Sequence, residues 1–438
     1  MLTIYVDQIT PRLTYTLEVL FERMSTLTYT LKEASVETAY SLPAINYSSK
    51  DIPGSFSLYC EGLLEEDHIR EVGLQHRSIH HVPCLAPSPS HQWELEFDPF
   101  AASFYLLSHY EYYQENHIDS YGRYEQVRYP SSSLQLEERP LVYQYLSILL
   151  NHLQQHYPSI KWEEKELAPV DITFDIDFPW KYLHKSAAVQ VSGTIKDFLG
   201  GKWTQLSERI NTYRSGKDPF YVFDELLERL PQRYTTFFFL LERLHKNDSR
   251  FTWRLATYRK LIKRISEKGM KVGIHPSFRT WQDQDQLFFE KTKLEEIIDS
   301  EVICSRQHFL RYSLPSTYRY LEQIGIREEY TQCLFQQGGF PCGMAHPWPW
   351  FDLDNNRTSE LILHPTHLMD RSLLSYQKLN PDSAHKRFLA LWEKNLETKA
   401  PFTMLFHNDS FSDSGEWAGW QNTMYKWLDI MSKKADSL

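Results

Sequence analysis

Apolar positions recur at two spacings in about the first 160 residues. A spacing of three to four residues predicts helices at 13–24, 100–113 and 141–156, and a spacing of two predicts strands at 2–6, 27–32 and 44–47. Three prolines, Pro83, Pro87 and Pro89, predict a loop over 76–91. A charged segment, 161–168, ends at Pro169 and predicts a linker. We therefore expect a small α/β domain over residues 1–165.

Strand patterns alternate with helical patterns after this linker. Strands are expected at 170–177, 235–240, 271–275, 302–308 and 402–407, and helices at 222–230, 254–268, 286–299 and 315–324. Such alternation is typical of parallel strands wrapped by helices. We therefore expect residues 166–438 to form a (β/α) barrel domain, in which chemistry gathers at the C-terminal ends of the strands.

Composition and charge narrow the class of protein. The 438 residues are 42% hydrophobic and carry a net charge of −10, with no long basic stripe, so a nucleic-acid partner is disfavoured. Five widely spaced cysteines without a CxxC pair indicate reduced thiols. The N-terminus lacks a signal-peptide pattern, and no stretch approaches the roughly 20 apolar residues of a membrane span. These features predict a cytoplasmic protein without a transmembrane segment.

The first expected strand of the second domain carries two aspartates on one face. Residues 171–177 alternate strictly, so Thr173, Asp175 and Asp177 point the same way at the end of the strand. Aspartate is depleted in strands, and such a pair suits a site in which one carboxylate binds a metal and the other acts as a base. An edge strand with a polar face is the alternative interpretation.

Three further strands end in ionisable side chains. Pro276 stops one strand directly after His275, and another strand ends at His407. Arg306 and His308 share a face of the strand expected at 302–308. A lone histidine is more often structural than a ligand, but four strands that all end in ionisable groups are hard to explain by packing alone. Their convergence predicts a catalytic or metal site.

These segments resemble the motifs of the polysaccharide deacetylases, carbohydrate esterase family four with chitooligosaccharide deacetylase homology. The likeness extends over nearly the whole chain to a two-domain bacterial subgroup whose N-terminal domain has no known function. The resembling segments are Thr173-Phe174-Asp175-Ile176-Asp177, Thr236-Phe237-Phe238, Gly273-Ile274-His275, Ser305-Arg306-Gln307-His308 and Leu405-Phe406-His407.

The resemblance implies a distorted (β/α) barrel and a metal-dependent hydrolase. It makes Asp175 the general base, His407 the general acid and Arg306 the residue that orients Asp175. Asp177 and His275 become ligands of a divalent ion, most simply zinc, which would polarise the acetyl group and lower the pKa of bound water. The family has a second ligand histidine four residues after the first, where this chain has Arg279. His308, on the face of Arg306, is the expected substitute.

The implied substrate is a glycan that carries N-acetyl or O-acetyl groups, from an envelope or capsule or a precursor of these. Five residues are assigned to substrate binding: Phe178, Trp180, Arg279, Asp370 and Trp417. The alternative is a carbohydrate-binding protein that kept the barrel and lost its metal. Arg279 favours this alternative, as does Pro341 at a position where the subgroup tends to have arginine. The intact Asp175, Asp177, His275 and His407 favour the enzyme.

Overall fold

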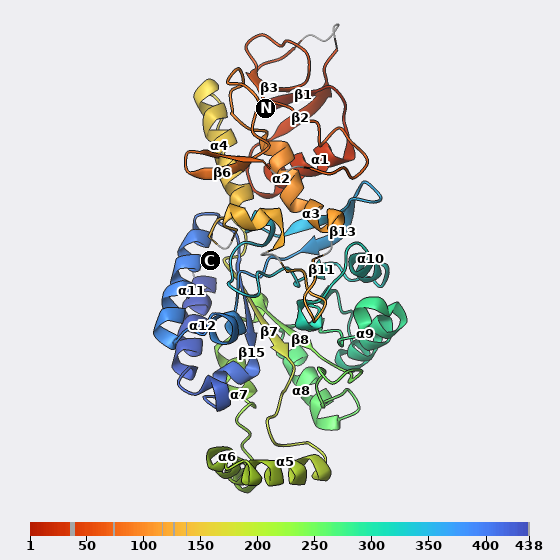
Figure 1. Ribbon diagram of the computed structural model, residues 1–438, viewed down its shortest axis with the longest axis vertical. Coiled ribbons are helices and arrows are strands. Elements are labelled where there is room, and N and C mark those ends of the chain that lie inside the picture. Colours follow the sequence, from red (N-terminus) through yellow and green to blue (C-terminus); the bar gives the residue numbers. More distant parts are fainter. Residues whose placement is uncertain (36–39, 73–74, 116, 126–127, 137, 437–438) are drawn as a thin grey trace. The chain divides into compact units, whose positions relative to one another are not determined.

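The computed structural model describes residues 1–35, 40–72, 75–115, 117–125, 128–136 and 138–436 (Figure 1). The chain divides into two compact units. Unit 1 comprises Met1–Leu167, Gly339–His367 and Glu393–Pro401, and unit 2 comprises Ala168–Gly338, Leu368–Trp392 and Phe402–Leu438. Two later segments thus belong to unit 1, which the sequence pattern did not reveal. The domain limits expected above, 1–165 and 166–438, stay a prediction.

Unit 1 contains a four-stranded parallel sheet in the order β2-β1-β3-β4. The strands are β1 (Leu2–Val6), β2 (Tyr29–Glu33), β3 (Ala44–Tyr47) and β4 (Phe56–Ser57). Helix α1 (Pro11–Leu17) follows β1 and continues as a π-helical turn, Glu18–Arg23. The helix begins after Thr10, whose hydroxyl oxygen accepts a hydrogen bond from the Leu13 N–H. The helix expected at 13–24 is therefore present.

Two expectations for unit 1 are wrong in detail. Residues 76–91 include an antiparallel hairpin, β5 (His76–Ile79) and β6 (Val82–Leu85), because Pro83 lies in a two-stranded sheet that leaves room for a missing N–H. The helix expected at 100–113 is two helices, α2 (Pro99–Leu107) and α3 (Tyr110–Gln114), since His109 adopts a left-handed φ of 56°. Helix α4 (Leu141–His156) agrees with the sequence pattern. The hairpin β12 (Trp348–Asp352) and β13 (Arg357–Leu363) completes the unit.

Unit 2 holds seven parallel strands in the order β11-β10-β9-β8-β7-β15-β14. Helices alternate with these strands along the chain, as the sequence predicted. Its strands are β7 (Val170–Ile176), β8 (Thr235–Phe239), β9 (Lys271–Ile274), β10 (Cys304–Ser305), β11 (Glu328–Glu329), β14 (Leu368–Met369) and β15 (Phe402–His407).

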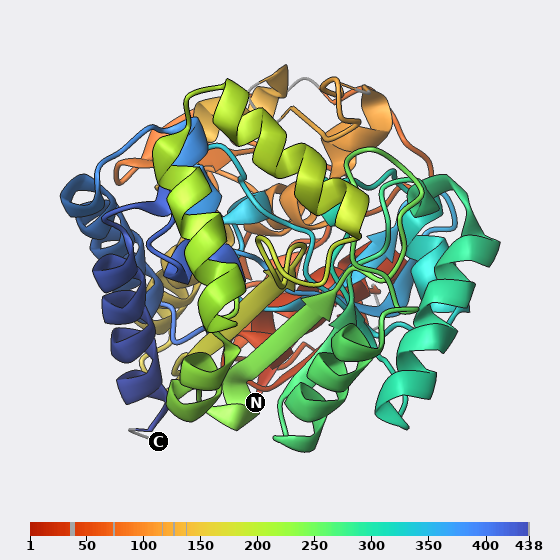
Figure 2. The same cartoon turned by 90° about the horizontal axis from the view of Figure 1, so that it is seen from below.

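The helices of unit 2 lie on both sides of β7 and β8. Helices α8 and α9 cover one side, and α11 and α12 the other, as both views show (Figures 1 and 2). The helices expected at 222–230, 254–268, 286–299 and 315–324 are all present. The full set is α5 (Ala187–Leu199), α6 (Trp203–Ser215), α7 (Phe223–Arg229), α8 (Ala256–Glu267), α9 (Gln284–Ile298), α10 (Ser316–Gln323), α11 (Pro381–Leu396), whose end lies in unit 1, and α12 (Gln421–Ala435).

The sequence predicted a distorted (β/α) barrel; over the described residues unit 2 has the expected parallel strands and helices, but its strands form an open sheet and no closed ring is found. Three of the seven strands contain only two residues each, which leaves little backbone to close a ring. The strand expected at 302–308 shortens to β10 because the chain turns soon after Ser305, with left-handed φ values of 63° at Phe309 and 55° at Leu310.

Within the described residues, no helix combines the length and the apolar character needed to cross a membrane.

Candidate metal and catalytic site

Parallel pairing gathers the predicted polar residues at one edge of the sheet of unit 2. Asp175 of β7 is the register partner of His407 at the end of β15. On the other side, Ile274 of β9 pairs with Ser305 of β10. Since His275 and Arg306 each follow directly, they leave the sheet side by side. The parallel direction of the strands therefore brings residues that are far apart in the sequence next to one another.

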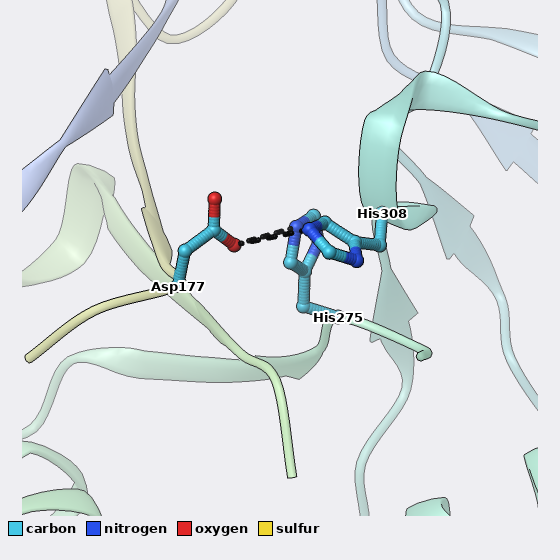
Figure 3. A group of neighbouring side chains, drawn as sticks. All are labelled: Asp177, His275 and His308. Carbon is cyan, nitrogen blue, oxygen red and sulfur yellow. Dashed lines mark ion pairs between the residues drawn. The ribbon is translucent and has the colours of Figure 1, made fainter. Parts of the chain in front are cut away.

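Asp177, His275 and His308 form a group that could hold a metal ion (Figure 3). The Asp177 Oδ1 atom lies 3.4 Å from His275 Nε2 and 3.6 Å from His308 Nε2. Ligands about 2.0–2.2 Å from one tetrahedral ion lie roughly 3.4 Å apart, so these separations suit a shared zinc-like ion. The structure thus brings His308, and not Arg279, to the two other expected ligands.

Each histidine of this group is held through its other ring nitrogen. His275 Nδ1 lies 2.6 Å from the Arg306 carbonyl oxygen, and His308 Nδ1 lies 3.2 Å from Asp248 Oδ1. Both partners only accept hydrogen bonds, so each Nδ1 carries a proton and each Nε2 is the ring nitrogen that faces Asp177. Partners of this type fix the tautomer and the ring orientation of histidines that bind metals.

The Asp177 carboxylate is in the state that a metal site requires. Burial raises its pKa, but the surrounding His308, His275 and His407 overcome this effect and hold the pKa well below its usual range. Among the described residues, its buried Oδ1 makes no hydrogen bond. A buried anionic oxygen with no hydrogen bond, facing two imidazole nitrogens, fits a cation between them.

Asp175 lies beside this group in an ion pair with Arg306. Arg306 donates from one terminal nitrogen to Asp175 Oδ1 at 3.0 Å and from Nε to the Tyr330 carbonyl at 3.0 Å. The Arg306 side chain is 0% exposed and the Asp175 side chain is 4% exposed, so the pair is almost dry. Asp175 Oδ2 points toward His275 Nε2, 3.7 Å away. The arrangement orients one carboxylate oxygen and leaves the other facing the site.

His407 is the third side chain that faces Asp177. Its Nε2 lies 3.9 Å from Asp177 Oδ2, while its Nδ1 lies 2.8 Å from Asp370 Oδ1. Burial lowers the pKa of His407, but the Asp370 carboxylate outweighs burial and raises the pKa to about 9. The backbone N–H of His407 also donates to Asp370 Oδ2 at 2.7 Å. Asp370, assigned to substrate binding from the sequence, is 0% exposed and instead positions His407.

Asp248 is the functional residue that the sequence analysis missed. It lies in the loop after β8, and its carboxylate also accepts hydrogen bonds from the N–H groups of Leu244, His245 and Phe278. Burial raises its pKa, but the hydrogen bonds from His308 and Phe278 more than offset burial, and the pKa is lowered. Its sequence context, Asn247-Asp248-Ser249, is typical of an ordinary turn, so no periodicity could have singled it out.

The other residues assigned to substrate binding occupy different environments. Phe178 follows Asp177 and is 40% exposed, whereas Trp180 is buried beside a cavity of about 560 Å³ whose lining includes Tyr221. Arg279 is exposed. Trp417 is fully buried, and its indole N–H donates to Asp409 at 3.2 Å. Of these residues, Phe178 is adjacent to Asp177 in the chain and Asp370 contacts His407.

Packing beneath the site depends on one glycine. A Cβ atom at Gly273 would lie 2.5 Å from the Phe238 ring and 2.9 Å from Cys304 Sγ, well inside normal contact. The Arg306 guanidinium lies 4.7 Å from the centre of the same Phe238 ring. The missing side chain at Gly273 thus lets Phe238 support the arginine that holds Asp175.

Comparison with known proteins finds a family match for the N-terminal residues and distant likenesses in structure. Residues 2–158 match DUF7033, a family of unknown function. No curated protein matches the chain.

Several solved structures are similar to part of the chain, and three of them serve as examples. A protein from Mycobacterium smegmatis, assigned as a polysaccharide deacetylase, is 15% identical, with a TM-score of 0.37, over 64% of this chain and 92% of that one. A CE4 family pseudoenzyme from Bacillus anthracis is 11% identical, with a TM-score of 0.31, over 62% and 61%. A polysaccharide deacetylase from Bacillus cereus is 12% identical, with a TM-score of 0.29, over 62% and 89%. We base the function on the geometry of the site itself.

Proposed function

We propose that unit 2 is a metal-dependent carbohydrate deacetylase. One observation carries the proposal. Asp177 forms the possible ligand group with His275 and His308. The oriented carboxylate of Asp175 and the oriented ring of His407 lie beside this same group. Asp175 is held by Arg306 at 3.0 Å, and His407 is held by Asp370 at 2.8 Å. A purely structural cluster would not need a free carboxylate oxygen and a free imidazole nitrogen on the same side.

Hydrolysis of an acetamido group needs a proton acceptor and a proton donor. Asp175 Oδ2 accepts the proton of the attacking water, whose oxygen bonds to the acetyl carbon. His407 Nε2 then gives a proton to the sugar nitrogen as the carbon–nitrogen bond breaks, so acetate and a free amine leave. Arg306 keeps Asp175 in place, and Asp370 keeps the His407 ring turned toward the site.

Asp177, His275 and His308 would hold the metal. A divalent ion bound there supplies Lewis-acid polarisation of the acetyl oxygen and activates water at neutral pH. The three residues supply one carboxylate oxygen and two imidazole nitrogens, a set common for catalytic zinc.

The substrate class follows from the motif resemblance and from the rim of the site. Polysaccharide deacetylases act on acetylated sugars, and the half-exposed Phe178 ring directly follows Asp177. An aromatic face can stack on the apolar face of a sugar ring. An acetylated glycan of an envelope or capsule, or its precursor, is therefore the proposed substrate.

Release of acetate from N-acetylated oligosaccharides, with zinc or cobalt supplied, tests this function. The wild-type protein should release acetate, and chelation should stop the release. Metal content of the purified protein should approach one ion per chain and fall in His308→Ala. Bound metal without acetate release from N- or O-acetylated glycans would contradict the enzyme and favour the carbohydrate-binding alternative.

A further inference from the structure

Helices α5 and α6 form a hairpin with apolar side chains turned to solvent. The two helices run side by side at the end of long connections that leave β7 and return to α7 (Figure 1). On α5, Val191, Ile195 and Phe198 follow one another at helical spacing and are 59%, 52% and 56% exposed. Leu199, at the end of the same stripe, is 78% exposed. No residue of α5 is buried.

Helix α6 continues this exposed surface. Trp203, at its start, is 62% exposed, and its ring contacts Phe198 with centroids 5.6 Å apart. Ile210 and Tyr213 follow Trp203 at helical spacing and are 41% and 39% exposed. We define the apolar ridge as Val191, Ile195, Phe198, Leu199, Trp203, Ile210 and Tyr213.

Both acidic side chains of the hairpin, Asp197 and Glu208, form ion pairs. Arg209 of α6 forms an ion pair with Asp197 of α5 at 2.5 Å, and its guanidinium nitrogens would lie 3.0 Å from a Cβ atom at Gly193. Glu208 pairs with Lys181 at 2.7 Å. The hairpin therefore exposes the apolar stripes that an ordinary surface helix buries.

The base of the hairpin is fixed beside the catalytic edge of the sheet. The Asp218 carboxylate accepts hydrogen bonds from the backbone N–H groups of Lys181, Tyr182 and Leu183 at 2.8–2.9 Å. Asn408, next to His407, donates from Nδ2 to the carbonyl oxygens of Phe178 at 3.0 Å and Phe220 at 2.8 Å. Both connections of the hairpin are thus tied to residues adjacent to Asp177 and His407.

The hairpin also differs in charge from the rest of the chain. Residues 185–217 contain six lysines and arginines against two acids, a net charge of +4, whereas the whole chain carries −10. Because Asp197 and Glu208 are already paired with Arg209 and Lys181, the exposed Lys196, Lys202, Arg214 and Lys217 leave positive charge around the ridge.

We propose that the hairpin docks unit 2 on an anionic lipid surface. Exposed aromatic and aliphatic side chains flanked by lysine and arginine suit the boundary between acyl chains and negatively charged headgroups. The ridge would enter the interface, and the lysine ammonium groups would reach the headgroups. The positive charge selects an anionic membrane over a neutral one.

This docking extends the proposed function and, for the substrate, rests on it. A site tied to a membrane-bound hairpin faces glycans that are themselves attached to a lipid. The structure therefore favours acetylated glycans on a lipid carrier as the substrate class, over free oligosaccharides.

Flotation of the full chain with vesicles tests the docking without any turnover. We expect binding to vesicles of phosphatidylcholine and phosphatidylglycerol, weaker binding to phosphatidylcholine alone, and loss of binding at high salt. The double variant Phe198→Ser and Trp203→Ser should lower the partition coefficient at least about tenfold, because two large apolar side chains no longer leave water. Lys196→Glu with Lys202→Glu should abolish the preference for anionic lipid.

Phe288→Ser on α9 is the matched control, since Phe288 is 55% exposed and lies outside the hairpin. It should bind vesicles as the wild type does. Absence of vesicle binding, or equal loss in the control, would overturn the docking. So would a wild-type dimer that Phe198→Ser with Trp203→Ser converts to monomers, because the ridge would then be covered by a second copy of the chain.

Acetate release separates the docking from the proposed function. The ridge variant should retain wild-type rates on a soluble N-acetylated oligosaccharide and lose rate, about tenfold, on the same glycan attached to a lipid in vesicles. No acetate release from either substrate, with vesicle binding intact, would refute the proposed function and leave the docking standing. Equal rates of the variant on both substrates would refute the lipid-carried substrate.

Discussion

In a soluble protein, charged side chains are usually exposed and large apolar side chains are usually buried. The sheet edge around Asp177 reverses the first tendency, and the α5–α6 hairpin reverses the second. The edge buries charged side chains, among them Asp175 and Arg306, at 4% and 0% exposure. The hairpin exposes apolar side chains, among them Leu199 at 78%. Burial of ions and exposure of large apolar groups both cost free energy unless a partner is present.

The two regions differ in where that partner is found. At the sheet edge, the partners lie within the chain, as Asp370 does for His407 and Asp248 does for His308. At the hairpin, Asp197 and Glu208 have partners within the chain, but the side chains of the apolar ridge are exposed to solvent. The first arrangement is typical of a reaction centre and the second of a docking surface.

The largest effect should follow removal of the proposed base. Asp175→Asn keeps an oxygen that can accept the hydrogen bond from Arg306, so the fold and the metal content should change little. Deacetylation should fall by on the order of 10²–10⁴, since the amide cannot take a proton from water. Acetate release and metal content, measured on the same preparation, check this. Activity that survives the substitution would mean that another group is the base.

A smaller effect should follow changes in the residue behind His308. Asp248→Asn weakens the hydrogen bond that orients the His308 ring and should reduce metal affinity by about 10–100-fold. Competition with a zinc chelator measures this affinity. Asp370→Asn is the matched control, because Asp370 holds His407 instead, and it should reduce activity while metal affinity stays within about twofold of the wild type. Equal metal loss in both variants would contradict the separate roles.

Packing beneath Arg306 gives the next prediction. Gly273→Ala places a methyl group against Phe238 and Cys304 and should lower the free energy of unfolding by about 1–3 kcal/mol. Urea denaturation followed by circular dichroism measures the loss. Gly201→Ala, in open space between α5 and α6 but at a φ of +62°, is a useful contrast, since any cost there comes from backbone strain alone and should be about 1 kcal/mol. A larger loss at Gly201 would refute the packing explanation.

The smallest effect concerns Glu111, a buried carboxylate that accepts hydrogen bonds from Ser131. Burial raises the pKa of Glu111 to about 7, although Ser131 donates to it through its N–H at 3.1 Å and its hydroxyl. The unfolded value is about 4.3, so the folded chain holds the extra proton between these pH values, and stability falls as pH rises through this window.

Glu111→Gln removes this titration. Relative to the wild type, the free energy of unfolding of the variant should rise by on the order of 1 kcal/mol per pH unit between about pH 4.5 and 7. Urea denaturation at several pH values measures the difference. Glu71→Gln, at an exposed position, should show no such slope. A flat difference for Glu111→Gln would mean that this carboxylate ionises normally in the folded protein.

The sequence predicted the strand-end residues because a strand has a simple period. Alternation places Asp175 and Asp177 on one face, and the apolar runs before His275 and His407 mark where those strands end. Parallel pairing then brings the ends together whether or not the sheet closes. The open sheet was not predictable, because alternation indicates parallel strands but does not determine how many residues of each strand pair with a neighbouring strand.

Features that depend on loops or on contacts distant in sequence could not be predicted. Asp248 reaches His308 through a turn with no periodic signal, and the role of Asp370 depends on the pairing of β14 with β15. The break at His109 depends on a single left-handed residue inside an apolar helical pattern. Helices α5 and α6 were not predicted, because the sequence pattern did not distinguish their apolar residues from the polar residues around them.

Arg306 has one role through its main chain and another through its side chain, and a substitution can separate the two roles. Its main-chain carbonyl holds His275, whereas its guanidinium holds Asp175. Replacement of the side chain leaves the carbonyl in place, so the metal ligands would persist while the base loses its orientation. A single codon change at this position is therefore enough to separate catalysis from binding, which gives evolution a short route from an enzyme of this architecture to a metal-bearing carbohydrate receptor.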